Sequence, residues 1–237
     1  MKLILTNDDG IEAPGLEALE KASIAYGEVT VVAPDRQHSG SGHRVTEGGP
    51  ISIDSPDVRK YAIGGTPADC SRIGLAHLVP DADWVLSGIN SGGNLGCDVF
   101  MSGTVAAVRE ATLMGRKAIA FSQYRQGMSS PFDWATSSAW TGVVLDRLFS
   151  ESLEPGEFWN VNFPDPGVID DEPELVFCPV DVQHYRLECE PGTAGVEYRS
   201  VYQERPRTPG RDIDVCFGGN ISISKLTVCS NAPGMSQ

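Results

Sequence analysis

The chain has 237 residues, of which 41% are hydrophobic, and its formal net charge is −14 at pH 7. This length and hydrophobic content suffice to bury one sizeable core, so we expect a single domain overall. The acidic balance argues against a nucleic-acid duplex or an anionic membrane as a partner, but an anionic small substrate stays open, because a bound divalent cation reverses the local field.

Strand and helix patterns alternate from the N-terminus. The short, largely apolar run over residues 3–6 is typical of a buried strand. Pro14 then falls in the first turn of a helix that Gly27 ends. Residues 28–34 form a second strand, and a polar, glycine-rich loop follows over residues 35–42.

The next segment holds short strands up to residues 61–63, followed by a helix. Thr66 is the expected N-cap of this helix, Pro67 its first residue and Asp69 the acid at its third position. This placement favours a role for Asp69 in starting the helix rather than in catalysis. A strand over residues 84–89 comes next.

The pattern then continues through four more elements. A loop over residues 90–103 leads into a helix that Gly115 closes, and a strand follows over residues 117–121. The last long helix covers residues 134–149, and a further strand covers residues 158–163. Strands that alternate with helices predict βαβ units and an α/β fold with a mainly parallel sheet.

Beyond these elements the pattern changes to short β segments with long connections, at residues 175–177, 196–199 and 221–224. We therefore expect an antiparallel, β-rich extension, with an acidic solvated loop at residues 170–174. A boundary near Asp165 divides the chain into an α/β catalytic core over residues 1–164 and an extension over residues 165–237. The extension is expected to complete the fold and to contribute to oligomerisation.

The cysteine spacings and the lengths of the apolar stretches bear on the cellular location of the protein. The six cysteines show no C-x-x-C pair: Cys70, Cys97, Cys178, Cys189, Cys216 and Cys229. These spacings do not favour zinc and predict reduced thiols. The apolar start of the chain is too short for a secretory leader, and no apolar stretch approaches membrane-spanning length. We therefore expect a cytoplasmic protein.

Two adjacent aspartates, Asp8 and Asp9, follow the first strand. At ~4 Å and an effective dielectric of about 20 their repulsion is roughly 4 kcal/mol, and a divalent cation attracts each carboxylate about twice as strongly. Because ligands in open α/β sheets bind beyond the carboxyl ends of strands, a metal site is the first hypothesis. The alternative is a turn with Asx hydrogen bonds. Both carboxylates reach one ion only if the chain leaves extended geometry, which Asn7 and Gly10 favour.

Further polar residues follow the later strands, at Ser39, Asn90, Asn94 and Ser102–Thr104. In a parallel sheet these loops share one edge, so the residues can converge on one pocket. Oxygen donors suit Mg²⁺ or Mn²⁺, and the start of the helix after Ser102 offers an anion site. Each residue alone has a simpler interpretation: Ser39 as a loop serine, the asparagines as turn residues, Ser102 as an N-cap. His43 is either an acid–base group or a surface residue.

At these residues the chain resembles the SurE (survival protein E) family of stationary-phase nucleotidases. Six ordered blocks carry the resemblance and cover nearly all of residues 1–122. They are Asn7-Asp8-Asp9-Gly10 with Ala13-Pro14-Gly15; Ala33-Pro34-Asp35-Arg36 leading to Ser39-Gly40; Gly42-His43 with Thr46; Gly65-Thr66-Pro67-Ala68-Asp69-Cys70; Ser87-Gly88-Ile89-Asn90-Ser91-Gly92 with Asn94-Leu95-Gly96; and Ser102-Gly103-Thr104-Val105-Ala106-Ala107.

The resemblance implies a metal-dependent phosphomonoesterase that acts on nucleoside 5′-monophosphates, often on 3′-monophosphates and sometimes on short polyphosphate. It implies a Rossmann-like α/β domain whose β-rich C-terminal extension exchanges between the subunits of a dimer, sometimes within a tetramer. The implied metal ligands are Asp8, Asp9, Ser39 and Asn90. The implied phosphate contacts are Asn94, Ser102, Gly103 and Thr104.

The C-terminal part departs from the family pattern. Where the family usually carries a Thr-Asp pair and a Gly-Tyr before a Ser-Ile-Thr-Pro-Leu strand, this chain has Arg211-Asp212, Gly219-Asn220 and residues 221–226. These differences affect what the resemblance implies about subunit exchange, tetramer formation and the nucleoside pocket.

Our hypothesis is hydrolysis assisted by one divalent cation per subunit, Mg²⁺ or Mn²⁺, in a homodimer or homotetramer. Asp8 or Asp9 orients or deprotonates the water, and a phospho-aspartate intermediate is a variant of the scheme. No aromatic clamp for a base is evident near this edge. A broad-specificity phosphatase or exopolyphosphatase therefore stays an alternative, as does a non-catalytic nucleotide-binding module.

Overall fold

The structure is a computed structural model that describes residues 1–127, 132–169, 171–183, 187–193 and 195–228. Asp170 of the expected acidic loop and Cys229 of the expected reduced thiols lie outside these residues. The strands are β1 (Lys2–Thr6), β2 (Glu28–Pro34), β3 (Ile53–Asp57), β4 (Lys60–Ile63), β5 (Trp84–Ser91), β6 (Lys117–Gln123), β7 (Glu157–Phe163), β8 (Leu175–Phe177), β9 (Cys189–Gly192), β10 (Gly195–Tyr198) and β11 (Ile221–Thr227). The helices are α1 (Pro14–Ser23), α2 (Pro67–Ile73), α3 (Gly103–Leu113), α4 (Trp134–Leu148) and α5 (Asp212–Phe217).

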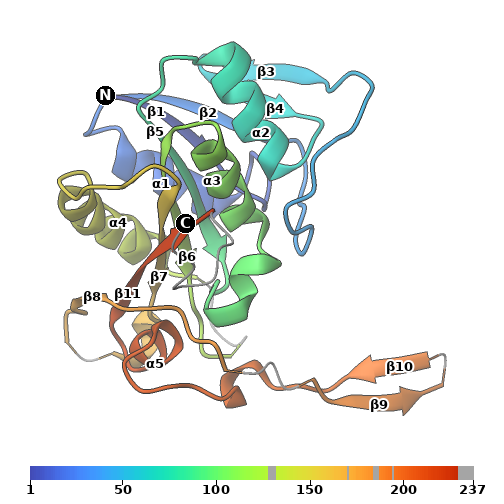
Figure 1. The fold of residues 1–237 in the computed structure, drawn as a ribbon, viewed down its shortest axis with the longest axis vertical. Helices are drawn as coiled ribbons and strands as arrows, with labels where there is room; N and C mark the ends of the chain where they lie inside the picture. Colours follow the sequence, from blue (N-terminus) through green and yellow to red (C-terminus); the bar gives the residue numbers. More distant parts are fainter. Residues whose placement is uncertain (128–131, 170, 184–186, 194, 229–237) are drawn as a thin grey trace, which may run out of the picture.

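Within the described residues, nine strands form one sheet in the order β3-β4-β2-β1-β5-β6-β7-β11-β8 (Figure 1). The run from β4 to β7 is parallel throughout. The edge strand β3 is antiparallel to β4, and β11 is antiparallel to β7. This topology confirms the predicted α/β fold with a mainly parallel sheet.

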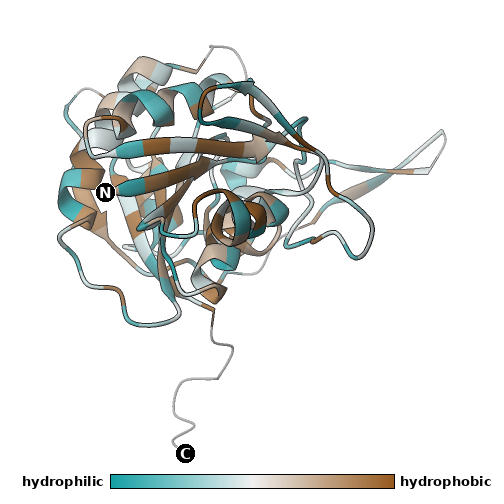
Figure 2. Cartoon of the chain, turned by 90° about the horizontal axis from the view of Figure 1, so that it is seen from above, coloured by the Kyte–Doolittle hydropathy of each residue, from teal (hydrophilic) through white to brown (hydrophobic). Residues whose placement is uncertain are grey.

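Helices cover both faces of the sheet, and strand β1 shows how the sequence divides its side chains between them. Leu3 and Leu5 belong to the core cluster that includes residues of α1 and α4. Ile4 belongs to a second cluster with residues of α2 and α3. Because successive strand side chains point to opposite faces, a continuous apolar run builds both layers. Figure 2 shows the central strands among the more hydrophobic segments of the fold.

The start of α2 follows the prediction closely. Thr66 accepts a hydrogen bond from the Asp69 backbone N–H at 3.2 Å, and the Asp69 carboxylate accepts one from the Thr66 N–H at 2.9 Å. Pro67 occupies the first turn. The pair is a capping box, so Asp69 belongs to the helix start as expected. Of the helices in the described ranges, none has both the length and the apolar character that a bilayer crossing demands.

The C-terminal extension is β-rich as predicted, but its pairing is mixed. β8 and β11 join the main sheet, and β8 runs parallel to β11, so the expected antiparallel arrangement is only partly right. β9 and β10 form a separate antiparallel hairpin that projects away from the sheet (Figure 1). The sequence did not indicate β9 or the short helix α5, which precedes β11.

Candidate metal and phosphate site

The loops that follow β1, β2 and β5 begin at one edge of the sheet, because these three strands are parallel neighbours. The loop after β1 turns sharply at Asn7. The Asn7 amide donates to the Gly10 carbonyl at 2.8 Å and its Oδ1 accepts from the Gly10 N–H at 3.2 Å, while Gly10 has a φ of +104°. The Asx turn is therefore present. It takes Asp8 and Asp9 out of extended geometry, as the shared-ion hypothesis requires.

Asp8 is buried, with 4% of its surface exposed, and lies against the start of α3. Its Oδ1 accepts a hydrogen bond from the Thr104 hydroxyl at 2.5 Å. A Cβ placed on Gly103 would lie 2.7 Å from the Asp8 Cβ, so glycine is what allows the helix start to approach this closely. The Asp8 carbonyl accepts from the His38 N–H at 2.7 Å, which ties the loop after β2 to the same point.

Burial raises the pKa of Asp8 to about 6, against the opposing effect of the Thr104 hydrogen bond, and the neighbouring charge of Asp9 raises it further. Among the residues that the structure describes, Asp8 has no Lys or Arg partner. A buried carboxylate without a cationic partner is costly to ionise and marks a candidate functional site. A cation at this position would favour the ionised form.

Asp9 is half-buried and links the loops that follow β2 and β5. Its carboxylate accepts from the Ser91 backbone N–H at 3.2 Å and from the Ser91 hydroxyl at 3.3 Å. The Gln37 amide donates to Asp9 at 3.4 Å and to the Ser39 hydroxyl at 2.8 Å. Sequence reasoning named neither Gln37 nor Ser91 as a site residue, although each lies within two residues of a predicted ligand.

Asn90 lies at the end of β5, where the pairing with β6 shifts register. Its amide group donates to the Gly92 carbonyl at 2.7 Å, which leaves the side-chain oxygen as the atom suited to a cation. The hydrogen bonds within the described ranges connect Asp9 to Ser39 through Gln37 and to the residue after Asn90. They do not join Asp8 directly to Ser39 or to Asn90.

The donor set has the chemistry of a hard cation site. Across the described part of the chain, no three His, Cys, Asp or Glu side chains are grouped so as to hold a metal ion. A cation here would therefore need the neutral oxygens of Ser39 and Asn90 besides the two carboxylates. Carboxylate, hydroxyl and amide oxygens are ligands that Mg²⁺ and Mn²⁺ accept, so the residues fit such an ion.

The start of α3 has the features of an anion site. Ser102 is the N-cap, and its hydroxyl accepts from the Val105 N–H at 3.0 Å, so its N-cap interpretation is confirmed. Gly103 and Thr104 are the first helical residues, where backbone N–H groups have no intrahelical acceptor and the helix dipole is positive. The Thr104 hydroxyl donates to the Asp8 carboxylate, and a backbone hydrogen bond from Thr104 also lowers the pKa of Asp8.

Asn94 is anchored in a buried polar network. Its amide donates to the Ser122 hydroxyl at 2.7 Å, and its backbone N–H donates to the Asn162 side chain at 2.7 Å. Its carbonyl accepts from the Asn160 amide at 2.9 Å. These contacts use one of the two side-chain amide hydrogens of Asn94, so one remains for a phosphate oxygen.

His43 anchors the loop after β2 to α3. Its Nε2 lies 2.7 Å from Glu110, which also accepts from the Arg72 guanidinium at 2.7 Å. Glu110 is buried in α3, and hydrogen bonds from His43 and Arg72 hold its pKa below the ordinary value against the effect of burial. His43 is therefore held by its contact with Glu110 rather than lying free on the surface.

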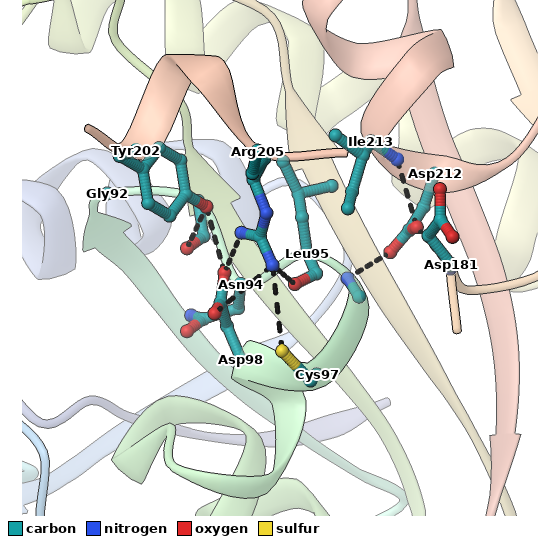
Figure 3. Close-up of polar contacts among 12 residues, drawn as sticks. Gly92, Asn94, Leu95, Cys97, Asp98, Asp181, Tyr202, Arg205, Asp212 and Ile213 are labelled. Carbon is teal, nitrogen blue, oxygen red and sulfur yellow. Dashed lines mark hydrogen bonds and ion pairs between the residues drawn. The ribbon is translucent and has the colours of Figure 1, made fainter. Parts of the chain in front are cut away.

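The C-terminal part of the chain holds the loop after β5 (Figure 3). Asp98 accepts hydrogen bonds from the Tyr202 hydroxyl at 2.9 Å and from the Arg205 guanidinium at 2.5 Å. The Asp212 carboxylate accepts from the Gly96 N–H at 2.7 Å. We call Tyr202, Arg205 and Asp212 the C-terminal contacts. Sequence reasoning missed them, because each pairs with a residue about a hundred positions away.

Three comparisons with known proteins point to one family. The family model described as Survival protein SurE matches residues 3–186. A Synechocystis protein named putative 5′-nucleotidase is 47% identical over 230 residues, which are 96% of this chain and 100% of the relative. A Pelobacter propionicus protein named 5′-nucleotidase SurE is 46% identical over 177 residues, covering 74% of this chain and 71% of the relative.

The fold is also similar to a solved one. The crystal structure of the SurE protein from Aquifex aeolicus superimposes with a TM-score of 0.85 at 28% sequence identity, and the match covers 98% of this chain and 95% of that chain. The likeness therefore extends over the C-terminal extension as well as over the parallel sheet.

Proposed function

The chain belongs to the survival protein SurE family, and on that premise we propose that it is a 5′-nucleotidase. In this proposal it hydrolyses nucleoside 5′-monophosphates, and also 3′-monophosphates, to a nucleoside and phosphate. The activity depends on one divalent cation per subunit, Mg²⁺ or Mn²⁺. The names of the Synechocystis and Pelobacter propionicus relatives support the nucleotidase activity, and the site geometry supports the cation.

One observation carries the proposal: the buried carboxylate of Asp8 lies directly against the first residues of α3. Asp8 is 4% exposed and its carboxylate accepts a hydrogen bond from Thr104, so an acidic group lies directly beside the N-terminus of a helix. An ionised Asp8 would repel a phosphate oxygen at the helix start, and a positive charge beside it would offset that repulsion. This pairing supports a cation that Asp8 would help to hold and that would supply positive charge beside the phosphate.

The residues that would hold the cation are Asp8, Asp9, Ser39 and Asn90. When bound, a divalent cation supplies charge stabilisation to the phosphoryl group and a lower pKa to the attacking water. Asp9 is the more accessible of the two carboxylates, so it is the better placed to orient that water or to accept its proton. Asp8 then acts mainly as the buried anchor.

The phosphate would be bound on the helix side of the site. The backbone N–H groups of Gly103 and Thr104 and the free amide hydrogen of Asn94 would donate to its oxygens. Ser102 would act by fixing the first turn of α3 through its hydrogen bond with Val105. Donors that are already fixed by the fold stabilise developing charge without reorganising.

The test is release of inorganic phosphate from AMP and GMP, measured with EDTA and after separate addition of Mg²⁺, Mn²⁺ and Co²⁺. We expect turnover that EDTA abolishes and that Mg²⁺ or Mn²⁺ restores. Adding 3′-AMP, glycerol phosphate and short polyphosphate to the panel separates a nucleotidase from a broad-specificity phosphatase or an exopolyphosphatase. Nucleotide binding without any phosphate release would instead favour a non-catalytic nucleotide-binding module.

We also propose that residues 1–164 are the catalytic core and that residues 165–237 complete the fold and mediate a homodimer or homotetramer. The exposed apolar side chains of Val196 and Tyr198 on the projecting hairpin support the second part. The five cysteines in the described ranges are free thiols. Free thiols support the proposed cytoplasmic location.

A further inference from the structure

Strand β7 carries two fully buried asparagines, Asn160 and Asn162, among large apolar residues. The neighbouring side chains of Trp159 and Val161 belong to the core cluster of α1 and α4, on the opposite face of the sheet. Phe158, two positions before Asn160, belongs to the cluster of α2 and α3. Asn160 and Asn162 therefore lie on the face that α2 and α3 cover. Burying two amides there is costly unless they are hydrogen-bonded, so each needs a partner within the fold.

Both asparagines are hydrogen-bonded to the backbone of Asn94, a residue that we expect to contact the phosphate. The Asn162 Oδ1 accepts from the Asn94 N–H at 2.7 Å, and the Asn162 amide group donates to the Asn94 carbonyl at 3.2 Å. The Asn160 amide group donates to the same carbonyl at 2.9 Å. Asn162 therefore engages both backbone groups of Asn94, as a neighbouring strand would, although Asn94 lies in the loop after β5.

The side chain of Asn94 is held from the adjacent strand β6. Its amide donates to the Ser122 hydroxyl at 2.7 Å, and Ser122 is paired with Asn162 in the register of β6 and β7. Ser122 is fully buried, and Asn94 is only 6% exposed. Three buried side chains from two neighbouring strands thus converge on one loop residue. Because they hold its backbone and its side chain together, β6 and β7 set the position of the remaining amide hydrogen of Asn94.

We propose that Asn162, assisted by Asn160, is a positioning residue of the phosphate site: it places Asn94 so that its free amide hydrogen meets a phosphate oxygen. This inference rests on the proposed function and deepens it, because it adds residues of β7 that act through Asn94. A donor that the fold holds in place stabilises charge on the phosphoryl group without reorganising. A displacement of about 1 Å can lower the rate about a hundredfold.

The test is a double-mutant cycle on AMP turnover with Mn²⁺, using Asn162→Ala, Asn94→Ala and the variant that carries both changes. We expect kcat/KM to fall about a hundredfold in Asn162→Ala. The double variant should match Asn94→Ala within about twofold, because Asn162 has no amide left to position. Losses that multiply in the double variant would overturn the inference, since Asn162 would then affect turnover independently of Asn94.

Ser224→Ala is the matched control. Ser224 lies on β11 opposite Asn160, is 1% exposed and donates its hydroxyl hydrogen to the Cys178 carbonyl at 2.8 Å. Its removal should lower the stability, as the loss of a buried hydrogen bond does, and leave kcat/KM within about twofold. An equal loss of turnover in Ser224→Ala and Asn162→Ala would overturn the inference, because it would indicate a general effect of weakening the core.

Mn²⁺ affinity, measured by calorimetry, should be unchanged in Asn162→Ala. A loss of Mn²⁺ binding would overturn the inference, because the effect would then lie in the cation site. Circular dichroism and thermal melting establish that each variant is folded. If Asn162→Ala does not fold, Asn160→Ala takes its place in the cycle. It removes one donor and leaves the bond to the Asn94 N–H, so we expect a loss of about tenfold.

Binding of inorganic phosphate in the presence of Mn²⁺ separates failure of this inference from failure of the proposed function. Weaker phosphate binding by folded Asn162→Ala than by Ser224→Ala supports the positioning role even if the wild type releases no phosphate from AMP. Unchanged turnover and phosphate binding in folded Asn162→Ala would overturn the positioning role alone. A wild-type protein that neither hydrolyses AMP nor binds phosphate would contradict the proposed function and the positioning role together.

Discussion

The Asp8 side chain packs against the backbone at the start of α3. There is no room for an additional atom between Asp8 and Gly103. A Cβ on Gly103 would lie 2.9 Å from one Asp8 carboxylate oxygen as well as 2.7 Å from its Cβ. Sequence reasoning assigned Gly103 to phosphate binding for its backbone N–H. The structure adds a second reason for glycine, which is the space that its missing side chain leaves for the carboxylate.

Gly103→Ala should therefore displace Asp8 or the first turn of α3. We expect a loss of stability of about 1–3 kcal/mol, as is usual for overpacking, together with a large loss of AMP turnover. Gly142→Ala is the control, because its Cβ would meet only the Tyr26 hydroxyl, at 3.9 Å. In the middle of α4 that change should be neutral or stabilising by roughly 0.5–1 kcal/mol. Urea denaturation and phosphate release measure both effects, and equal behaviour of the two variants would contradict the packing argument.

At the scale of elements, the start of α2 is held by a carboxylate that receives hydrogen bonds from two threonines. Asp69 is 1% exposed and accepts from the Thr46 hydroxyl at 2.6 Å and from the Thr66 N–H at 2.9 Å. Burial alone would raise the pKa of Asp69, but these hydrogen bonds outweigh it and hold the pKa below the ordinary value. The capping box therefore joins α2 to the long loop after β2.

Asp69→Asn should destabilise the protein by about 1–3 kcal/mol near pH 7. Because the pKa is lower in the folded state, the ionised form stabilises the fold above the ordinary value of 3.8, and this stabilisation is lost as the pH falls through the folded-state pKa. The difference between wild type and variant should therefore shrink at about pH 3. Urea denaturation at both pH values tests this. If the difference in unfolding free energy between wild type and Asp69→Asn grows on acidification, the pKa of Asp69 is not lowered by folding.

The C-terminal contacts hold the loop after β5 in place. The Arg205 and Asp98 side chains are only 9% and 14% exposed, so removing the cation leaves a nearly buried carboxylate. We expect Arg205→Met to cost about 2 kcal/mol or more and to speed hydrogen exchange of the loop that carries Asn94.

Arg199→Met is the matched control, because Arg199 pairs with Glu197 and Glu190 at the surface and is itself 55% exposed. Its cost should stay below about 1 kcal/mol. If the two arginine variants unfold alike and exchange alike in this loop, the C-terminal contacts do not support the site.

Across the whole molecule, the sequence predicts those helices and strands that are marked by residues within or next to them. Buried apolar runs, Pro14 and the Thr66–Asp69 start all mark their elements within a few residues. The pairing of β8 with β11 and of Arg205 with Asp98 depends on which distant segments meet, and no short pattern encodes that.

The projecting hairpin makes the proposed assembly testable. Val196 and Tyr198 are 69% and 75% exposed on β10, which is more apolar surface than an isolated arm favours. Changing both to aspartate should reduce the mass in solution from a dimer or tetramer to the single-chain value of 25.4 kDa. Light scattering after size-exclusion chromatography measures the mass. An unchanged mass in the double variant would show that the hairpin is not part of the subunit interface.

The central claim is that oxygen donors from separate loops hold a divalent cation that the reaction needs. Titration of Mn²⁺ into the wild-type chain, Asp9→Asn and the surface control Asp81→Asn, with AMP turnover measured on the same samples, tests it most directly. We predict one site per chain in the wild type and the control, and loss of both the site and the turnover in folded Asp9→Asn. An Asp9→Asn protein that hydrolyses AMP at a near wild-type rate with added Mn²⁺ would contradict the account.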